Sequence, residues 1–329
     1  AILESFSSQM FAGRGTTGWS RSWEADMHLI LQWAGLQPAI VYDETIRRDN
    51  LKNYKVLVMP YCDVLTESVA KAITAFQKRG GIVVADEFLC PAILPDILVQ
   101  SYSRTNTPHE DKAALQKIAA DLSAQLEPFY ERAVFSSNQD IVPRLRRYGK
   151  TDYLFTINDY RTYGAYLGHH RLVMEQGLPT RATVTMPRSG YVYDLVQHKL
   201  VTSAPKGEPV ILEQDYAAGE GKLHMITDVP LEKIVALVKP ETPSRGGKAH
   251  IFAWVCNDKN TPPNAITPIA VDIIDPEGRK AEFSGYYAAV KGSLQITFNF
   301  APNDIPGKWT VNARCLASGN TAKKTFVLE

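Results

Sequence analysis

Hydrophobic positions follow two different periods along this chain, and the change falls near residue 135. Before that point, short apolar runs at 56–59 and 82–85 flank a segment at 66–79 whose apolar residues recur at the spacing of one helix face. All-apolar strands on either side of a helix are typical of a parallel sheet that is covered on both faces. The pattern therefore predicts one β-α-β unit over residues 54–89.

The same periodicity predicts an α/β domain over residues 1–134. Further strands are expected at 2–7 and 38–42, and further helices at 22–34 and 111–127. Thr66 is expected to begin the helix of the β-α-β unit, and Asp111 is expected to cap helix 111–127. Gly80-Gly81 is expected to end the first of these helices, because glycine accepts the left-handed conformation that stops a helix.

After residue 135 the period becomes two, and short β-branched or aromatic stretches are separated by Gly, Pro and Asp. Strands at roughly ten-residue spacing predict antiparallel sandwiches. We expect two such domains, 135–239 and 240–329, with residues 240–248 as the linker. A Tyr- and His-rich loop is expected at 161–177, and loops of this length often carry function. The expected strands are 141–148, 153–158, 182–186, 191–195, 210–214, 222–227, 250–257, 269–275, 293–300, 308–314 and 321–328.

Composition narrows the classes of partner. The 329 residues are 45% hydrophobic and 22% charged, with a net charge of +1, which gives no general field for nucleic acid or an anionic membrane. The short basic group Arg144, Arg146 and Arg147 is expected on a solvated strand face. No stretch approaches the ~20 apolar residues that cross a bilayer, so no membrane span is predicted. The chain opens at Ala1 inside an apolar segment, and we expect a processed chain or a piece of a longer one.

Metal and cofactor sites are not predicted. The four cysteines, Cys62, Cys90, Cys256 and Cys315, form no zinc-type spacing. Cys256 and Cys315 end strand patterns in the same block, so either a disulfide or two buried thiols is expected. His169 and His170 are adjacent, and adjacent side chains point apart, so they are not expected to bind one metal ion together. The glycine-rich stretch 13–18 lacks the ending of a phosphate loop.

Phrases in all three regions resemble known families. L-x-x-Y-K-V-L-V-M-P at 51–60, the following helix and R-G-G-I-V-V at 79–84 resemble the glutamine-amidotransferase-like domain of glycoside hydrolase family 42 β-galactosidases, known as the trimerisation domain. D-Y-L-F-T-I-N at 152–158 and G-Y-V-Y-D-L at 190–195 look like a β-domain common at the ends of glycosidases. N-D-I-P-G-K-W-T-V at 303–311 is similar to immunoglobulin- or macroglobulin-like modules of secreted bacterial proteins.

The resemblance implies a fold, partners and a location. It implies a flavodoxin-like, class I amidotransferase-like domain followed by two immunoglobulin-like β-sandwich domains. A family 42 glycosidase works through two carboxylates at the mouth of a TIM barrel, and no eightfold β-α pattern exists in this chain. The chain would then be a non-catalytic accessory region that forms a homo-oligomer, with a trimer as first candidate, through the α/β domain. Sandwich modules of this kind imply an exported protein.

Amidotransferase chemistry would need a nucleophilic cysteine on a strained turn after strand 82–85. The turn instead reads Asp86-Glu87-Phe88-Leu89-Cys90-Pro91, without glycine beside the thiol. His109 and Glu110 supply a histidine and an acid, so a divergent hydrolase using Cys90, or the Asp86/Glu87 pair, stays an alternative. The other interpretation of Cys90 is an apolar thiol under a loop.

Ligand candidates lie where open α/β sheets bind ligands, at the carboxyl ends of strands. Asp86 and Glu87 end one strand, Tyr61 and Asp63 end its neighbour, and residues 7–9 end the first. The alternative is that Asp86 caps the next segment and Glu87 pairs with an arginine. In the β-region, Tyr160 and Tyr163 offer rings for stacking on sugars, or they are ordinary sandwich tyrosines. A carbohydrate-binding or adhesive module is therefore a further alternative function.

Overall fold

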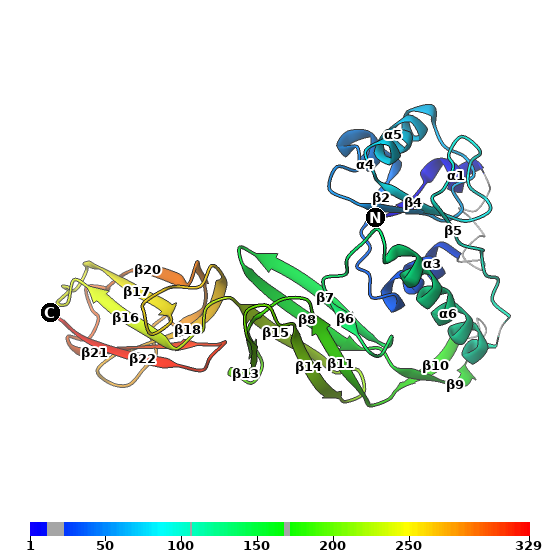
Figure 1. Ribbon diagram of the computed structural model, residues 1–329. Helices are drawn as coiled ribbons and strands as arrows, with labels where there is room; N and C mark the ends of the chain where they lie inside the picture. The colour runs from blue at the N-terminus through cyan, green and yellow to red at the C-terminus, as the bar shows by residue number, and fades with distance from the viewer. Residues whose placement is uncertain (12–22, 106, 168–171) are drawn as a thin grey trace. The chain divides into compact units, whose positions relative to one another are not determined.

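A computed structural model describes residues 1–11, 23–105, 107–167 and 172–329. The side chains of residues 163–175 lie outside this description. The chain is mainly β, with helices confined to its first part (Figure 1). It divides into two compact units. The first comprises Ala1–Val142, Asn158–Ala182 and Asp215–Gly219, and the second comprises Pro143–Ile157, Thr183–Gln214 and Glu220–Glu329. Each is described by itself.

A five-stranded sheet forms the centre of the first unit. Its order is β2-β1-β3-β4-β5, and every neighbouring pair is parallel. Strands β3 and β4 occupy the two apolar runs of the predicted β-α-β unit and are buried almost throughout. The strands are β1 (Ile2–Glu4), β2 (Ile40–Tyr42), β3 (Val56–Met59), β4 (Ile82–Ala85) and β5 (Ile97–Leu98).

Helices cover both faces of this sheet because its side chains alternate between them. Ile2, Val58 and Val84 pack with α3 and α6, whereas their neighbours Leu3 and Val83 pack with α4 and α5. Figure 1 shows the two helix pairs. The helices are α1 (Phe6–Phe11), α3 (Trp23–Trp33), α4 (Asp43–Asp49), α5 (Glu67–Lys78) and α6 (Pro108–Leu126).

Local chemistry explains how the helix of the β-α-β unit ends. Gly80 has φ 88°, which favours glycine, and a Cβ on Gly81 would lie 2.4 Å from the Phe76 ring. The predicted glycine stop is therefore confirmed. The predicted cap at Asp111 is wrong, because α6 begins at Pro108. Asp111 instead lies inside the helix and accepts hydrogen bonds from the Thr105 amide (2.8 Å) and the Tyr102 hydroxyl (2.8 Å).

Antiparallel sheets follow the helical part. One has the order β13-β12-β15-β8-β7 and another the order β14-β11-β6. The segment expected as a long loop at 161–177 is instead a hairpin of β9 and β10. The strands are β6 (Phe135–Ser136), β7 (Ile141–Tyr148), β8 (Thr151–Asn158), β9 (Arg161–Leu167), β10 (Leu172–Gly177), β11 (Thr180–Met186), β12 (Gly190–Asp194), β13 (Lys199–Ala204), β14 (Val210–Tyr216) and β15 (Gly221–Thr227).

The last seven strands form one continuous antiparallel sheet, in the order β16-β17-β20-β19-β18-β21-β22. The outermost strands β16 and β22 contact each other, so the sheet curls into a nearly closed barrel. Residues 240–248, predicted as a linker, connect two paired strands of this sheet. The strands are β16 (Lys233–Lys239), β17 (Lys248–Cys256), β18 (Ile266–Ile274), β19 (Gly285–Val290), β20 (Ser293–Asn299), β21 (Gly307–Cys315) and β22 (Thr321–Leu328).

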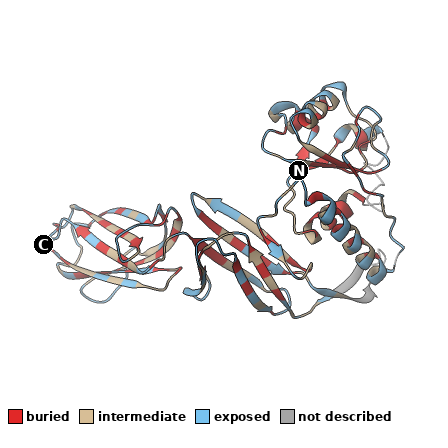
Figure 2. Cartoon of the chain, in the orientation of Figure 1, coloured by how far each residue is buried: buried red, intermediate tan, exposed pale blue. Residues whose placement is uncertain are grey.

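The barrel interior is filled by the alternating buried residues that Figure 2 shows along its strands. Phe300, Trp309 and Phe326 meet there, with the Phe300 and Trp309 ring centroids 5.3 Å apart and nearly perpendicular. In β21 the outward positions are polar, at Lys308, Thr310, Asn312 and Arg314. This alternation agrees with the pattern of one buried and one wet face predicted for strand 308–314.

Candidate functional site

The carboxyl edge of the parallel sheet gathers polar residues from four strands. Ser5 to Ser8 follow β1, Asp43 follows β2, Tyr61 follows β3, and Asp86 follows β4. Because all the strands are parallel, their carboxyl ends lie at one edge, where open α/β sheets bind ligands. Two buried aspartates organise this edge.

Asp86 is only 1% exposed and holds three segments together. Its Oδ2 accepts hydrogen bonds from Trp23 Nε1 (2.9 Å) and the Tyr61 amide (2.7 Å), and its Oδ1 accepts one from the Phe88 amide (3.0 Å). Burial raises the pKa of Asp86, and the three hydrogen bonds oppose that shift. The carboxylate of Asp86 thus caps the turn after β4, which is the alternative to ligand binding given above. It also holds α3 through the hydrogen bond from Trp23.

Asp43 is the second buried aspartate, and sequence reasoning missed it. Its Oδ2 accepts hydrogen bonds from the hydroxyls of Ser5 (3.3 Å) and Ser7 (3.3 Å) and from the Ser7 amide (3.2 Å). Its Oδ1 is buried and has no hydrogen-bond partner among the described residues. The available signal was an acid directly after an apolar strand, the same signal that singled out Asp86.

Residues 7–9, expected to end the first strand, lie in α1 instead. The Ser8 hydroxyl donates to the Val64 carbonyl (2.7 Å) and accepts from the Val64 amide (3.1 Å), so it ties α1 to the loop after β3. Cys62 lies nearby in that loop, fully buried. Burial first, and then the carboxylates of Asp86 and Asp43, raise the pKa of its thiol, which keeps it protonated and unreactive.

The other ligand candidates at this edge have local roles. The Tyr61 and Phe88 rings pack with centroids 5.0 Å apart. Glu87 accepts hydrogen bonds from the Ser101 amide (2.9 Å) and hydroxyl (2.5 Å), so the predicted arginine partner is replaced by a serine. Desolvation acts to raise the pKa of Glu87, but the hydrogen bonds from Ser101 outweigh this effect, and the pKa is lowered. Asp63 is half-buried in the loop after β3.

Cys90, His109 and Glu110 belong to different layers. The Cys90 amide bonds to the Cys62 carbonyl (2.8 Å), and the Cys62 side chain packs in the layer under α4 and α5. His109 and Glu110 are exposed in the first turn of α6, which packs on the opposite face of the sheet. The geometry therefore favours the interpretation of Cys90 as a half-buried thiol under a loop.

The aromatic candidates of the β-region are only partly described. Lys112 Nζ lies 5.5 Å from the centroid of the Tyr160 ring and also forms an ion pair with Asp140 (2.7 Å). One face of Tyr160 is thus occupied by a cation. The side chain of Tyr163, residues 13–18 and His169-His170 lie outside the described part of the structure.

The predicted disulfide is not formed. Cys256 and Cys315 are both buried free thiols, which is the other alternative given above. Burial raises the pKa of the Cys256 thiol. Among the described residues, no group of three or more His, Cys, Asp or Glu side chains is arranged to hold a metal ion. Within those residues, too, no helix has both the length and the apolar character to cross a membrane.

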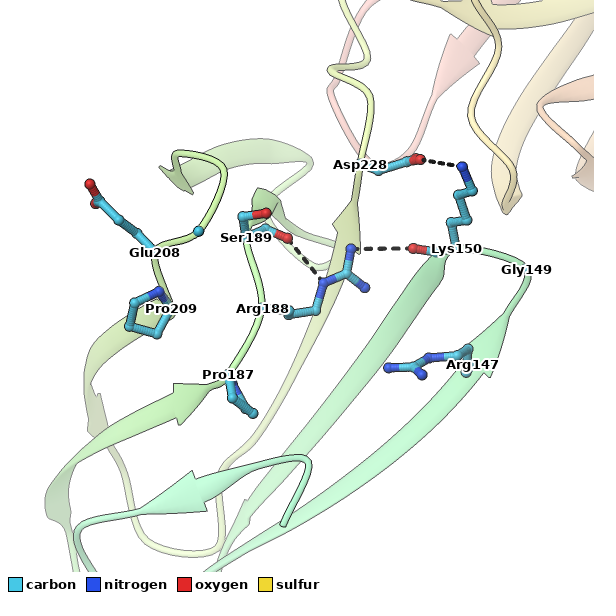
Figure 3. A pocket seen from close by; sticks show the side chains of 10 residues that line it. Arg147, Gly149, Lys150, Pro187, Arg188, Ser189, Glu208, Pro209 and Asp228 are labelled. Atoms are coloured by element: carbon cyan, nitrogen blue, oxygen red, sulfur yellow. Dashed lines mark hydrogen bonds and ion pairs between the residues drawn. The ribbon is translucent and has the colours of Figure 1, made fainter. Parts of the chain in front are cut away.

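A cleft of ≈ 780 Å³ opens beside the turn between β7 and β8 (Figure 3). Its arginines hold Asp152, whose side chain is fully buried: Arg147 Nε lies 2.6 Å from Oδ1, and Arg188 Nη1 lies 2.5 Å from Oδ2. Arg188 also donates to the carbonyls of Ser189 and Lys150. Arg147 is exposed, as expected for a solvated strand face, and it also reaches the buried carboxylate of Asp152. The charges of this cleft largely neutralise one another.

Comparisons with known proteins give distant structural neighbours. No family model matches the chain, and no curated protein matches its sequence. An α-L-fucosidase isoenzyme 2 from Paenibacillus thiaminolyticus is 12% identical, with a TM-score of 0.46, over 62% of this chain and 44% of that one. Gan42B, a GH42 β-galactosidase from G. stearothermophilus, is 11% identical, with a TM-score of 0.44, over 68% and 39%.

A β-galactosidase from Rahnella sp. R3 is 12% identical, with a TM-score of 0.42, over 68% of this chain and 40% of that one. The chain spans less than half the length of each of these three structures. At these values the likeness assigns neither an activity nor a substrate to this chain.

Proposed function

We propose that this chain is a non-catalytic accessory and assembly region of a glycoside-hydrolase-like multidomain protein that is exported. In this proposal the first part is a flavodoxin-like domain of the class I amidotransferase type, related to the family 42 trimerisation domain, and immunoglobulin-like β-domains follow it. The strand order β2-β1-β3-β4-β5 supports the first assignment, because it is the order of flavodoxin-like doubly wound sheets. The phrase at 51–60 contains its strand β3, and the phrase at 79–84 contains the first three residues of its strand β4.

The observation that carries the non-catalytic role is the turn after β4. An amidotransferase of this fold would present its nucleophile there, exposed and next to backbone amides that stabilise the oxyanion. In this chain the position holds Asp86, which is buried and itself accepts hydrogen bonds from the Tyr61 and Phe88 amides. Cys90 follows four residues later, and Pro91 beside it has no amide to donate. The residues needed for thiol chemistry are therefore not assembled in this turn.

Assembly is supported by apolar side chains at one edge of the parallel sheet. Strand β2 is an edge strand, and its Ile40 and Tyr42 are exposed. Helix α1 begins two residues after β1, which pairs with β2, and exposes Phe6, Met10 and Phe11, the last at 81%. An open strand edge and exposed aromatic residues are each features of surfaces that another chain commonly covers. We propose a second copy of this chain as the occupant.

Light scattering after size-exclusion chromatography tests the assembly. We expect the chain to elute as an oligomer and the double variant Phe11→Glu, Ile40→Lys to elute with the mass of one chain, because both changes place charge on the proposed interface. Leu94→Lys is the matched control, since Leu94 is 84% exposed in the loop between β4 and β5. A wild-type chain that remains monomeric at high concentration contradicts the proposal, and so does a loss of assembly in the control.

A further inference from the structure

The outer face of the C-terminal barrel carries an ordered platform of polar side chains. Strands β19, β18, β21 and β22 are neighbours in the sheet. Their register places Tyr286, Ala270, Arg314 and Thr321 in one row across them. Burial alternates along these strands, so the residues of this row lie on the outer face, opposite the packed interior.

A second row lies two residues further along the strands. Asp272, Asn312 and Lys323 are register partners in it, and Asp272 forms an ion pair with Lys280 at 2.7 Å. The two rows together make up the platform. It combines cations, an amide, a hydroxyl and one carboxylate, and all of these project from rigid strands rather than from loops.

The donors of this platform are not used within the chain. Among the described residues, the side chains of Arg314, Asn312 and Lys323 make no hydrogen bond or ion pair, and all three are exposed. The Asp272–Lys280 pair is neutral, so Arg314 and Lys323 leave two uncompensated positive charges. Tyr286 is 84% exposed, which is unusual for a tyrosine on the outer face of a regular strand.

The platform is also hollowed. It borders a groove of ≈ 970 Å³. Ala270 stands between Tyr286 and Arg314 and adds only a methyl group, while neighbouring strands are about 4.8 Å apart. Tyr286 and Arg314 are two strands apart, so the gap between them is roughly 10 Å wide. This gap has room for one sugar ring beside the tyrosine face.

We propose that this platform binds a glycan that carries an anionic substituent, a carboxylate or a sulfate. Arg314 would hold the anion, because its planar fork matches such oxygens. Tyr286 would stack on the sugar ring, and Asn312, Thr321 and Asp272 would bond its hydroxyls. This inference concerns the barrel alone and does not depend on the accessory role or on assembly.

The mixture of groups favours a glycan over other anions. Single-stranded nucleic acid is bound by several stacking aromatic rings along a strongly basic groove, whereas this face offers one ring and the whole chain has a net charge of +1. An acidic peptide would be satisfied by the cations and would leave the exposed ring of Tyr286 without a role. A hydroxylated ring with one charge uses the aromatic, neutral and charged groups together.

Titration calorimetry on the full chain tests the platform with five probes: polygalacturonate, dextran sulfate, neutral dextran, poly-glutamate and a single-stranded oligonucleotide. We expect at least one of the two anionic polysaccharides to bind, and the one that binds identifies the carboxylate or the sulfate. Binding is expected to weaken as salt rises, since the contact is exposed. Arg314→Gln and Tyr286→Ala are each expected to weaken it tenfold or more, and Tyr286→Phe is expected to retain it.

Lys259→Gln and Tyr160→Ala are the matched controls. Lys259 is an exposed cation of the barrel outside the platform, and Tyr160 is one of the two tyrosines that the sequence offers for stacking on sugars. Both are expected to bind as the wild type does. The proposal is overturned if neither anionic polysaccharide binds or if neutral dextran binds as tightly. It is also overturned if poly-glutamate or the oligonucleotide binds as tightly, or if Arg314→Gln and Tyr286→Ala leave binding unchanged.

Discussion

Single carboxylates hold much of the local structure at the carboxyl edge of the parallel sheet. Asp86 and Asp43 each lie one residue after the end of a strand of this sheet. The sequence pattern identified Asp86 but not Asp43. The donor to Asp86, Trp23 Nε1, lies 63 residues away along the chain, so no local pattern could have predicted the bond. Glu87 was expected beside an arginine and bonds to Ser101 for the same reason, because side-chain partners are chosen by the folded topology.

Replacing Asp86 tests whether it has this structural role. We expect Asp86→Ala to lower the free energy of unfolding by about 2–4 kcal/mol, because the buried Trp23 donor and two partly buried backbone amides lose their acceptor. Glu87→Ala is the matched control, since this neighbour is exposed and accepts only from Ser101; its cost should stay below about 1 kcal/mol. Urea denaturation followed by circular dichroism measures both, and equal effects would contradict the role given to Asp86.

At the scale of elements, prediction succeeded where the hydrophobic pattern was long or strongly bounded. The β-α-β unit over 54–89 was predicted correctly, because two apolar strands, an amphipathic helix and a glycine stop all agree there. The short helices α1 and α4 were missed, as was strand β5. Segments of two to seven residues carry too little periodicity, and contacts with the rest of the domain decide their conformation.

The β-region shows a second limit of pattern reading. Alternation predicted eleven strands of this region but missed β6, β13, β16 and β19, and it does not specify which strands pair. The strands after residue 240 were expected in a sandwich and form one curled sheet together with β16. The hairpin of β9 and β10 was expected to be a loop because its Tyr- and His-rich sequence shows no sustained alternation of apolar and polar residues.

Asp152 gives a prediction at this scale, because it joins β8 to Arg147 of β7 and to Arg188 after β11. Asp152→Ala should lower the free energy of unfolding by about 2–3 kcal/mol. Breaking a buried pair costs about 3–5 kcal/mol, and part is recovered because the freed Arg147 is 62% exposed and can turn to water. Thermal unfolding compares it with Glu67→Ala, which removes the exposed pair with Lys71 and should change little. A loss no larger than in this control would contradict the role of Asp152.

At the scale of the whole molecule, the proposed functions are divided between different parts of the chain. The parallel sheet offers an apolar edge for a second copy, and the barrel offers a polar platform with free cations and one exposed ring. The turn after β4, where a domain of the proposed amidotransferase type would present its nucleophile, holds the buried Asp86. Each of these features is separate in sequence, so the variants proposed above test them independently.

The central proposal is that this chain is a non-catalytic region. The most direct test measures ammonia release from glutamine and nitrophenol release from nitrophenyl glycosides by the purified chain. The wild type should show no rate above that of the variants Cys90→Ala and Glu87→Gln, because Cys90 and His109 belong to opposite faces of the sheet and Glu87 accepts hydrogen bonds from Ser101. A wild-type rate above background that either variant abolishes would contradict this account.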